Sequence, residues 1–301
     1  MEALLSLAFD NLSSKNTDKV RTGLKQIEGL LAQICLSKAT KLGHNRRASV
    51  ITSSNSETPK TLRELPIDPA FREFFRLQES FEYNVATHLL ATLNALLSRS
   101  PGTVDGHLSS TLAVLQGILL LHPPSRHLFI KQASMDTLLD LLDTANPPAV
   151  QQSAILVLVT ALLNNPPAIR TFERVDGLLS IKDLLRSEET SKGVKMRVLE
   201  FLYFYLMPEA PSSSPPISHS RGTALRVKRS TSSLAEDDED GGVSIVSSNG
   251  SYMAGGWGYD YDGERMEKTI KSTREKQRLL GQYLSNVDDL VEDLRESNLF
   301  G

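Results

Sequence analysis

The sequence predicts an all-α protein: a helical solenoid of the armadillo or HEAT type with a C-terminal amphipathic helix. Apolar residues recur at steps of three and four through most of residues 1–207, which is the spacing of one helix face. Within that stretch, residues 114–124 (VLQGILLLHPP) return 43 positions later as residues 157–167 (VLVTALLNNPP). A period near 43 is typical of armadillo and HEAT units, which bury their apolar faces by stacking on neighbouring units. The alternative is an irregular all-α domain that contains two similar helix pairs.

The chain is expected to begin with a helical hairpin. Residues 1–12 suit a short helix and residues 11–16 a turn. A second helix is expected over residues 18–35, with Thr17 or Asp18 as its N-cap. Its apolar stripe consists of Val20, Leu24, Ile27, Leu30, Leu31 and Ile34. Apolar periodicity then stops between residues 37 and 60, so we expect a disordered insertion there.

Another helix pair is expected between residues 69 and 98. Asp68 can cap its start, and Pro69 can occupy the first turn, where its missing N–H removes no hydrogen bond. Apolar side chains follow at helical spacing up to Ser98, with a break near Ser80.

The 43-residue repeat extends beyond the shared segment. Phe129 aligns with Phe172 at the same offset, and a third copy begins at Ser191 and ends at Met207–Pro208. Residues 154–159 are partly β-branched, but they align with a helix-like segment of the preceding copy. No strand is required anywhere in the chain.

These patterns divide the chain into three parts. Residues 1–207 form the predicted repeat domain. Residues 208–262 contain a Pro/Ser-rich stretch, a basic patch and an acidic run, and are expected to be a disordered linker. Residues 263–301 are expected to form the amphipathic helix that docks on or caps the repeats. Its heptad positions are Leu280, Leu284, Val287, Val291 and Leu294.

Composition excludes several kinds of partner. The 301 residues include 33 Lys and Arg against 36 Asp and Glu, and a formal net charge of −3 gives no field that attracts nucleic acid. The single cysteine, Cys35, can form neither an intramolecular disulfide nor a zinc site that needs paired cysteines. No apolar run approaches the roughly 18 residues that span a bilayer, so no membrane insertion is expected. We expect a cytoplasmic or nuclear protein.

No common catalytic constellation occurs in the sequence. There is no nucleophile elbow, no H-E-x-x-H and no phosphate-binding glycine loop. Residues 258–269 partly match a calcium loop but lack carboxylates at its first and twelfth positions. The sequence therefore predicts a protein that is not an enzyme, with no cofactor and no metal site.

The candidate partner-binding residues lie near the end of the repeats and in the tail. Residues 201–207 are seven consecutive apolar residues, which cannot all face the preceding repeat. A terminal repeat needs a cover on its outer face, either the tail helix or a partner. The predicted partner-binding residues are Phe201, Tyr203, Tyr205, Leu280, Leu284, Val287, Val291 and Leu294.

Two serines are candidate phosphorylation sites. His44, Arg46 and Ser49 match H-x-R-x-x-S, the pattern preferred by kinases of the nuclear Dbf2-related group. Ser232 follows Arg229 in the linker and is a weaker candidate of the same kind. Phosphate on Ser49 would add about −1.5 to −2 charges beside Arg46 and Arg47. The alternative is a basic spacer that is never modified.

Several segments together resemble one protein family. They are residues 1–10 (MEALLSLAFD), 71–78 (FREFFRLQ), 200–206 (EFLYFYL) and 280–291 (LGQYLSNVDDLV), with the two Pro-Pro turns between them. This order of segments resembles the fungal cell division control protein fourteen family, the septation initiation network component and not the phosphatase of the same name. The resemblance covers the repeats and the tail and leaves both linkers unmatched.

The resemblance implies a non-catalytic regulatory or scaffold subunit. Its expected partner is a germinal-centre-type Ser/Thr protein kinase, and its expected place is the spindle pole body, where it promotes septation and cytokinesis. The network also contains a nuclear Dbf2-related kinase, which would be the enzyme that modifies Ser49. The alternative is an armadillo-like adaptor for transport or for another complex unrelated to kinases, which the basic residues between 221 and 229 would favour.

Overall fold

The structure is a computed structural model of the whole chain, and it describes residues 1–37, 58–61, 63–99, 102–209 and 270–287. Most of the predicted insertion and linker, with Ser49 and Ser232, therefore lies outside the described residues. Val291 and Leu294, two of the predicted heptad positions of the tail, also lie outside the described residues.

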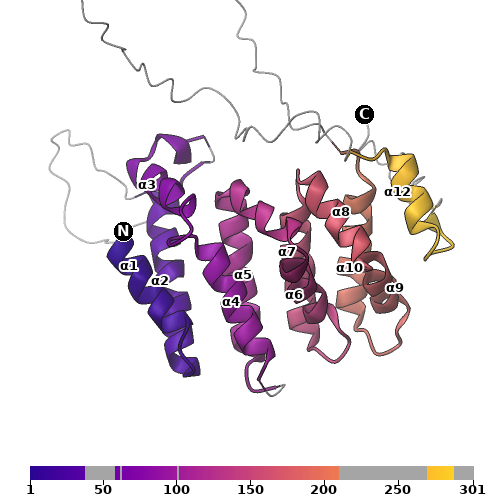
Figure 1. Cartoon of the computed structure of the whole chain (residues 1–301), viewed down its shortest axis with the longest axis horizontal. Coiled ribbons are helices and arrows are strands. Elements are labelled where there is room, and N and C mark those ends of the chain that lie inside the picture. Colours follow the sequence, from indigo (N-terminus) through magenta and orange to yellow (C-terminus); the bar gives the residue numbers. More distant parts are fainter. Residues whose placement is uncertain (38–57, 62, 100–101, 210–269, 288–301) are drawn as a thin grey trace, which may run out of the picture.

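The described helices form a row from the N-terminus to the tail (Figure 1). Along the row, α1 contacts α2 and α4, and α4 contacts α5. In the same way α5 contacts α7, α7 contacts α10, and α10 contacts α12. In chain order, the helices are α1 (Glu2–Leu12), α2 (Thr17–Cys35), η1 (Leu65–Ile67), α3 (Pro69–Gln78), α4 (Val85–Leu97), α5 (Asp105–Leu121), η2 (Pro123–Ile130), α6 (Gln132–Leu142), α7 (Pro148–Leu162), α8 (Pro166–Arg174), α9 (Gly177–Arg186), α10 (Lys192–Leu206) and α12 (Thr273–Leu280).

The prediction of an all-α fold is confirmed. The repeat is visible in the elements themselves, because α5 and η2 recur 43 residues later as α7 and α8. The β-branched stretch at residues 154–159 lies inside α7, as the alignment of the copies predicted. Assignment to the armadillo or HEAT type remains a prediction.

Hydrogen bonds from side chains to carbonyls join the successive copies. Arg126 Nη1 donates to the Leu163 carbonyl at 3.1 Å, and Asn165 Nδ2 donates back to the Arg126 carbonyl at 2.9 Å. Thr171 Oγ1 donates to the Ile130 carbonyl at 2.9 Å. These bonds satisfy buried carbonyl groups at helix ends, where the helices have no partners of their own.

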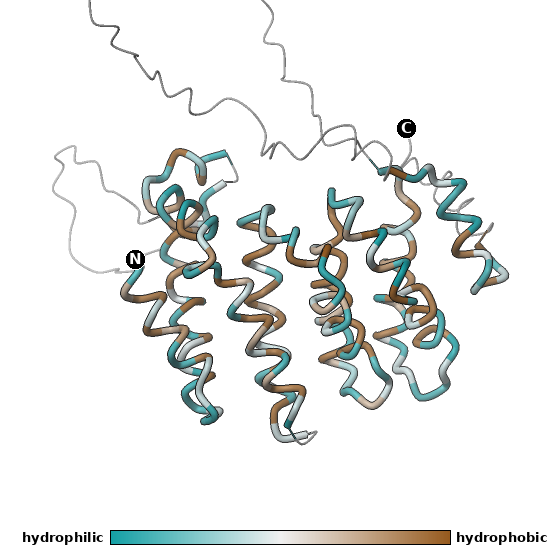
Figure 2. The backbone as a smooth tube through the Cα atoms, viewed as in Figure 1, coloured by the Kyte–Doolittle hydropathy of each residue, from teal (hydrophilic) through white to brown (hydrophobic). Residues whose placement is uncertain are grey.

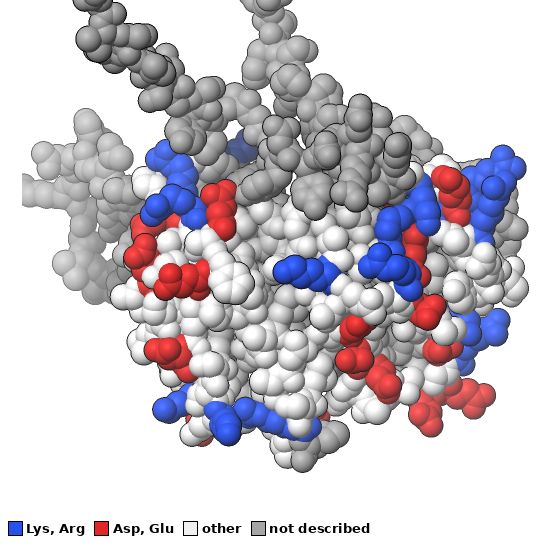
Figure 3. Space-filling model, viewed as in Figure 1, with Lys and Arg blue, Asp and Glu red and all other residues white. Residues whose placement is uncertain are grey.

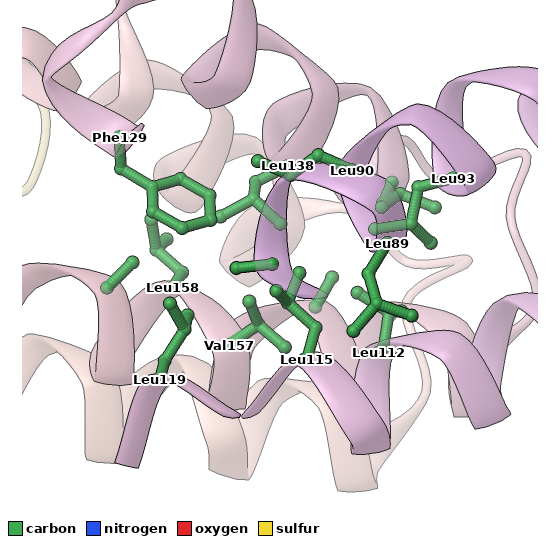
Figure 4. Close-up of a cluster of buried hydrophobic side chains, with 14 of the residues drawn as sticks. Leu89, Leu90, Leu93, Leu112, Leu115, Leu119, Phe129, Leu138, Val157 and Leu158 are labelled. Carbon is green, nitrogen blue, oxygen red and sulfur yellow. The ribbon is translucent and has the colours of Figure 1, made fainter. Parts of the chain in front are cut away.

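A continuous apolar core runs along the row. Figure 2 shows hydrophobic segments along the helices and hydrophilic residues at many of the turns between them. Figure 4 shows how side chains from α4, α5, η2, α6 and α7 meet in one cluster. Its labelled members, all at most 7% exposed, are Leu89, Leu90, Leu93, Leu112, Leu115, Leu119, Phe129, Leu138, Val157 and Leu158.

The predicted helix boundaries near the N-terminus are mostly confirmed. Asp68 caps α3 by accepting from the backbone N–H groups of Ala70 and Phe71, and α3 ends at Gln78, close to the predicted break. The predicted cap of α2 is wrong by one residue. Asn16 is the N-cap, and its side chain accepts from Asp18 N at 2.8 Å. The amide oxygen of asparagine fills this role as well as a hydroxyl or a carboxylate does.

The expectation of no strand is wrong in one detail. Two residues, Leu36–Ser37 (β1), pair antiparallel with Thr58–Pro59 (β2). Lys60 reinforces the pairing, because its N–H donates to the Cys35 carbonyl at 2.8 Å and its ammonium group bonds the Ile34 carbonyl and Asp68. Two-residue strands leave no periodic signal, so sequence alone could not reveal them.

The tail helix is shorter than the heptad pattern predicted. Within residues 270–287, α12 covers only Thr273–Leu280, and turns follow it. Its start is fixed by a capping box between Ser272 and Glu275, and Gly281 follows its last residue. No helix in the part of the chain that the structure describes is long and apolar enough to cross a membrane.

Candidate interaction surface at the C-terminal end

The helix α10 ends the row before the tail and is apolar throughout residues 201–206. Ser191 caps it by accepting from Val194 N at 3.3 Å. One face packs against the preceding helices α7 and α9. The buried residues of this face are Val194, Val198, Phe201, Leu202, Tyr205 and Leu206.

Most of the predicted partner-binding residues that the structure describes are buried within the chain. Phe201 is 0% exposed, Tyr205 1% and Leu280 0%. Leu284 and Val287 are also buried, and only Tyr203 is half-buried. Leu280, Leu284 and Val287 of the tail are thus buried in the chain, whereas Phe201 packs against Phe172 of α8. The choice between the tail and a partner as the cover of residues 201–207 stays a prediction.

The Phe201 ring is part of an aromatic cluster. It lies 5.5 Å from the Phe172 ring in an edge-to-face arrangement and 6.3 and 6.4 Å from the rings of Phe204 and Tyr205. Gly177 lies against Phe172, and a Cβ at this position would come within 2.2 Å of the Phe172 ring. Phe201 therefore belongs to the packed core between α8 and α10.

The opposite face of α10 bears an apolar stripe that we call the outer stripe. Its members follow one another at steps of three and four residues and are Met196, Leu199, Tyr203 and Met207. Met196 is 53% exposed and Met207 41%, while Leu199 and Tyr203 are half-buried. Sequence analysis found only Tyr203 of these four, because a helix that is apolar all round gives no periodic signal for its outward side.

Five charged side chains join the tail to the end of the row, and we call them the charge clasp: Arg170, Glu173, Glu209, Lys271 and Lys276. Arg170 Nη2 lies 2.6 Å from Glu209 Oε1 and 3.2 Å from Glu173 Oε1. Lys271 Nζ lies 2.6 Å from Glu173 Oε2, and Lys276 Nζ lies 3.0 Å from Glu209 Oε1. The side chains of Lys276 and Glu209 are 2% and 3% exposed, so this pair is screened little by solvent.

Lys276 also completes the C-terminus of α10. Its ammonium group donates to the carbonyls of Tyr205 and Met207, both at 2.9 Å, and lies 5.4 Å from the centre of the Tyr205 ring. The last carbonyls of a helix have no partners of their own, and a cation near them is favourable. A residue of the tail thus caps a helix about 70 positions earlier in the chain.

Burial changes the acid–base behaviour of this region. It lowers the pKa of Lys276, although the neighbouring Glu209 carboxylate acts in the opposite direction. Burial also raises the pKa of Tyr205, and the Glu173 carboxylate adds to the rise. The Tyr205 hydroxyl donates to Glu173 Oε1 at 2.7 Å and therefore stays protonated at neutral pH.

One member of the charge clasp is incompletely bonded. The Nε and Nη1 atoms of Arg170 are buried without a hydrogen-bond partner. A third carboxylate, Glu275, is exposed and bonded to Ser272; these bonds lower its pKa, and the charges of Lys271 and Arg170 act in the same direction. A buried donor without an acceptor costs roughly 1–3 kcal/mol, so Arg170 weakens the cluster that it belongs to.

Other chemical features of the described residues have no reactive arrangement. Burial raises the pKa of the Cys35 thiol, which makes it a poor nucleophile at neutral pH. Within the described ranges, no group of three or more His, Cys, Asp or Glu side chains could hold a metal ion. A cavity of about 440 Å³ between α6 and α9 is lined by Asp136, Asp140 and Asp183, and Figure 3 shows acidic side chains over these helices.

Comparisons with known proteins place the chain in a family. A family model described as "Cell division control protein 14, SIN component" matches residues 1–300. The chain belongs to this family. A relative from Schizosaccharomyces pombe, "Cell division control protein 14", is 26% identical over 310 residues, which cover 100% of this chain and 97% of the relative. No solved structure matches the chain.

Membership assigns the chain a role in septation initiation, as the resemblance implied. The match includes the helical row and the tail together.

Proposed function

We propose that this chain is a non-catalytic regulatory or scaffold subunit that binds a germinal-centre-type Ser/Thr protein kinase through the outer stripe of α10. The main observation in favour is the outer stripe itself: four apolar side chains on one face of the last helix of the row, two of them more than 40% exposed. Apolar residues at this spacing are how a helix presents itself to the groove of a partner.

The position of the stripe supports the same proposal. The charge clasp fixes α12 beside α10, so the stripe and the tail form one continuous end of the molecule. Phe201 and Tyr205, predicted from the sequence as partner-binding residues, are buried and would act in this proposal by supporting the stripe from below.

A matched pair of variants tests this assignment. Met196→Asp places a charge in the middle of the stripe, and we expect it to weaken capture of the cognate germinal-centre kinase by about thirtyfold or more. Leu120→Asp is the control, because Leu120 of α5 is 53% exposed, the same fraction as Met196. Binding affinity is measured with purified full-length chains whose helix content is checked by circular dichroism.

Two results would contradict the assignment. If Met196→Asp binds the kinase as the unchanged chain does, the stripe is not the contact surface. If the unchanged chain does not bind the kinase at all, the kinase is not the partner, and an adaptor for another complex becomes the better proposal.

We further propose that the chain is cytoplasmic and is recruited to the spindle pole body, and that a nuclear Dbf2-related kinase modifies Ser49. The sequence around Ser49 and the family membership support these statements. A fluorescent fusion of the unchanged chain and of Ser49→Ala tests both. A diffuse signal for the unchanged chain would contradict the location, and a lack of phosphate on Ser49 in dividing cells would contradict the modification.

A further inference from the structure

The tail is attached to the row by both charged and apolar contacts. Four of the eight residues of α12 are charged. Leu280 within the helix and Leu284 and Val287 after it are buried, and Leu279 and Tyr283 pack half-buried against the same core. Isolated helices of this length are not stable in water, so α12 depends on its contacts with α10.

The charge clasp determines where the tail docks on the row more than it strengthens that docking. Bringing ions out of water costs several kcal/mol for each ion, and their mutual attraction offsets this cost only where every group is well bonded. Lys276 meets that condition, with two carbonyls and the Glu209 carboxylate around its ammonium group. Arg170 does not, because two of its nitrogen atoms have no acceptor.

Lys276 also joins the position of the tail to the shape of α10. When the tail leaves, the carbonyls of Tyr205 and Met207 lose the ammonium group that caps them. The last turn of α10, which contains Tyr203 of the outer stripe and is followed directly by Met207, then loses part of its support.

We propose that residues 270–287 form a latch, held by Lys276 and weakened by the unbonded donors of Arg170, whose docking sets the order of the last turn of α10. The two cations thus have opposite effects: Lys276 strengthens the latch, and Arg170 weakens it. The test of the latch uses the chain alone, without the kinase, so failure of the latch and failure of the proposed kinase binding are distinguishable.

The same substitution at the two positions tests the latch. Lys276→Met removes the cap and leaves Glu209 with Arg170, and we expect amide hydrogen exchange in α12 and in the last turn of α10 to speed up on the order of a hundredfold. Arg170→Met removes the unsatisfied donors, and each carboxylate keeps other partners: Lys271 and the Tyr205 hydroxyl for Glu173, and Lys276 for Glu209. We expect exchange in α12 to be no faster than in the unchanged chain.

Exchange of the amides of α5 and α7 is the internal control that both full-length variants fold. If both variants speed up exchange in α12 alike, the cluster is an ordinary structural network and the inference is wrong. If Lys276→Met leaves exchange in α12 unchanged, the apolar contacts hold the tail, and the inference is wrong as well.

Discussion

Replacing Phe201 with alanine is expected to lower the free energy of unfolding by about 3–5 kcal/mol. The Phe201 side chain is 0% exposed and packs edge-to-face on Phe172, which is itself fully buried. Truncation removes apolar contacts and leaves a cavity between α8 and α10, because Gly177 and its neighbours hold Phe172 in place. The midpoint and slope of urea denaturation, followed by circular dichroism, measure the change.

Phe81→Ala is the matched control for this experiment. Phe81 is 88% exposed, so the same truncation is expected to change the free energy of unfolding by no more than about 0.5 kcal/mol. A loss below about 1 kcal/mol for Phe201→Ala would mean that the ring is not part of the core. That result would favour the prediction from the sequence that Phe201 contacts a partner directly.

The second large effect is a loss of stability in acid that depends on His122. The imidazole is 1% exposed. Its ring centre lies 4.4 Å from the centre of the Phe75 ring in an edge-to-face arrangement, and one hydrogen bond of 2.8 Å joins its Nδ1 atom to Ser125 Oγ. Burial lowers the pKa of His122 to about 4 from an ordinary value of 6.5. The unfolded chain therefore binds a proton at a pH where the folded chain does not.

The direction of this pH effect follows from which state of the chain, folded or unfolded, binds the proton on His122 more tightly. The contribution of His122 is fully present above pH 6.5 and is lost as the pH falls from 6.5 toward 4, with a total loss of about 3 kcal/mol. Burial also lowers the pKa of His127, which adds a further loss in the same direction.

His122→Asn isolates the contribution of this one side chain. Asparagine is the residue that the next copy of the repeat has at the equivalent position, Asn165, where it is buried and hydrogen-bonded. We expect the variant to lose clearly less stability than the unchanged chain between pH 7 and pH 4, measured by urea denaturation at each pH. Equal losses in the two proteins would contradict the account of His122.

The parts of the fold that sequence reasoning predicted are those encoded by local patterns. The 43-residue repeat predicted the matching pairs α5 with α7 and η2 with α8, since each copy repeats the same apolar spacing and the same Pro-Pro start. Asp68 before Pro69 predicted the start of α3 because capping is a property of adjacent residues. The need for a cover on the terminal repeat predicted either the tail or a partner there, and Leu280, Leu284 and Val287 of the tail are buried.

The parts that were missed depend on contacts between distant residues. The charge clasp joins Glu173 to Lys271 and Glu209 to Lys276, and nothing in the spacing of these residues predicts that they meet. Residues 201–207 are apolar throughout, so the pattern could not show that Phe201 and Tyr205 face inward. It equally could not show that Met196 and Met207 face outward.

The central claim is that a kinase partner binds the outer stripe beside the docked tail. Hydrogen exchange of the full-length chain with and without the cognate germinal-centre kinase tests it most directly. We expect slower exchange in residues 192–207 and 273–287 of the complex, and no change in α1 and α2. Slower exchange confined to α1, α2 or the turn around Phe81, with none in α10 or α12, would contradict the claim.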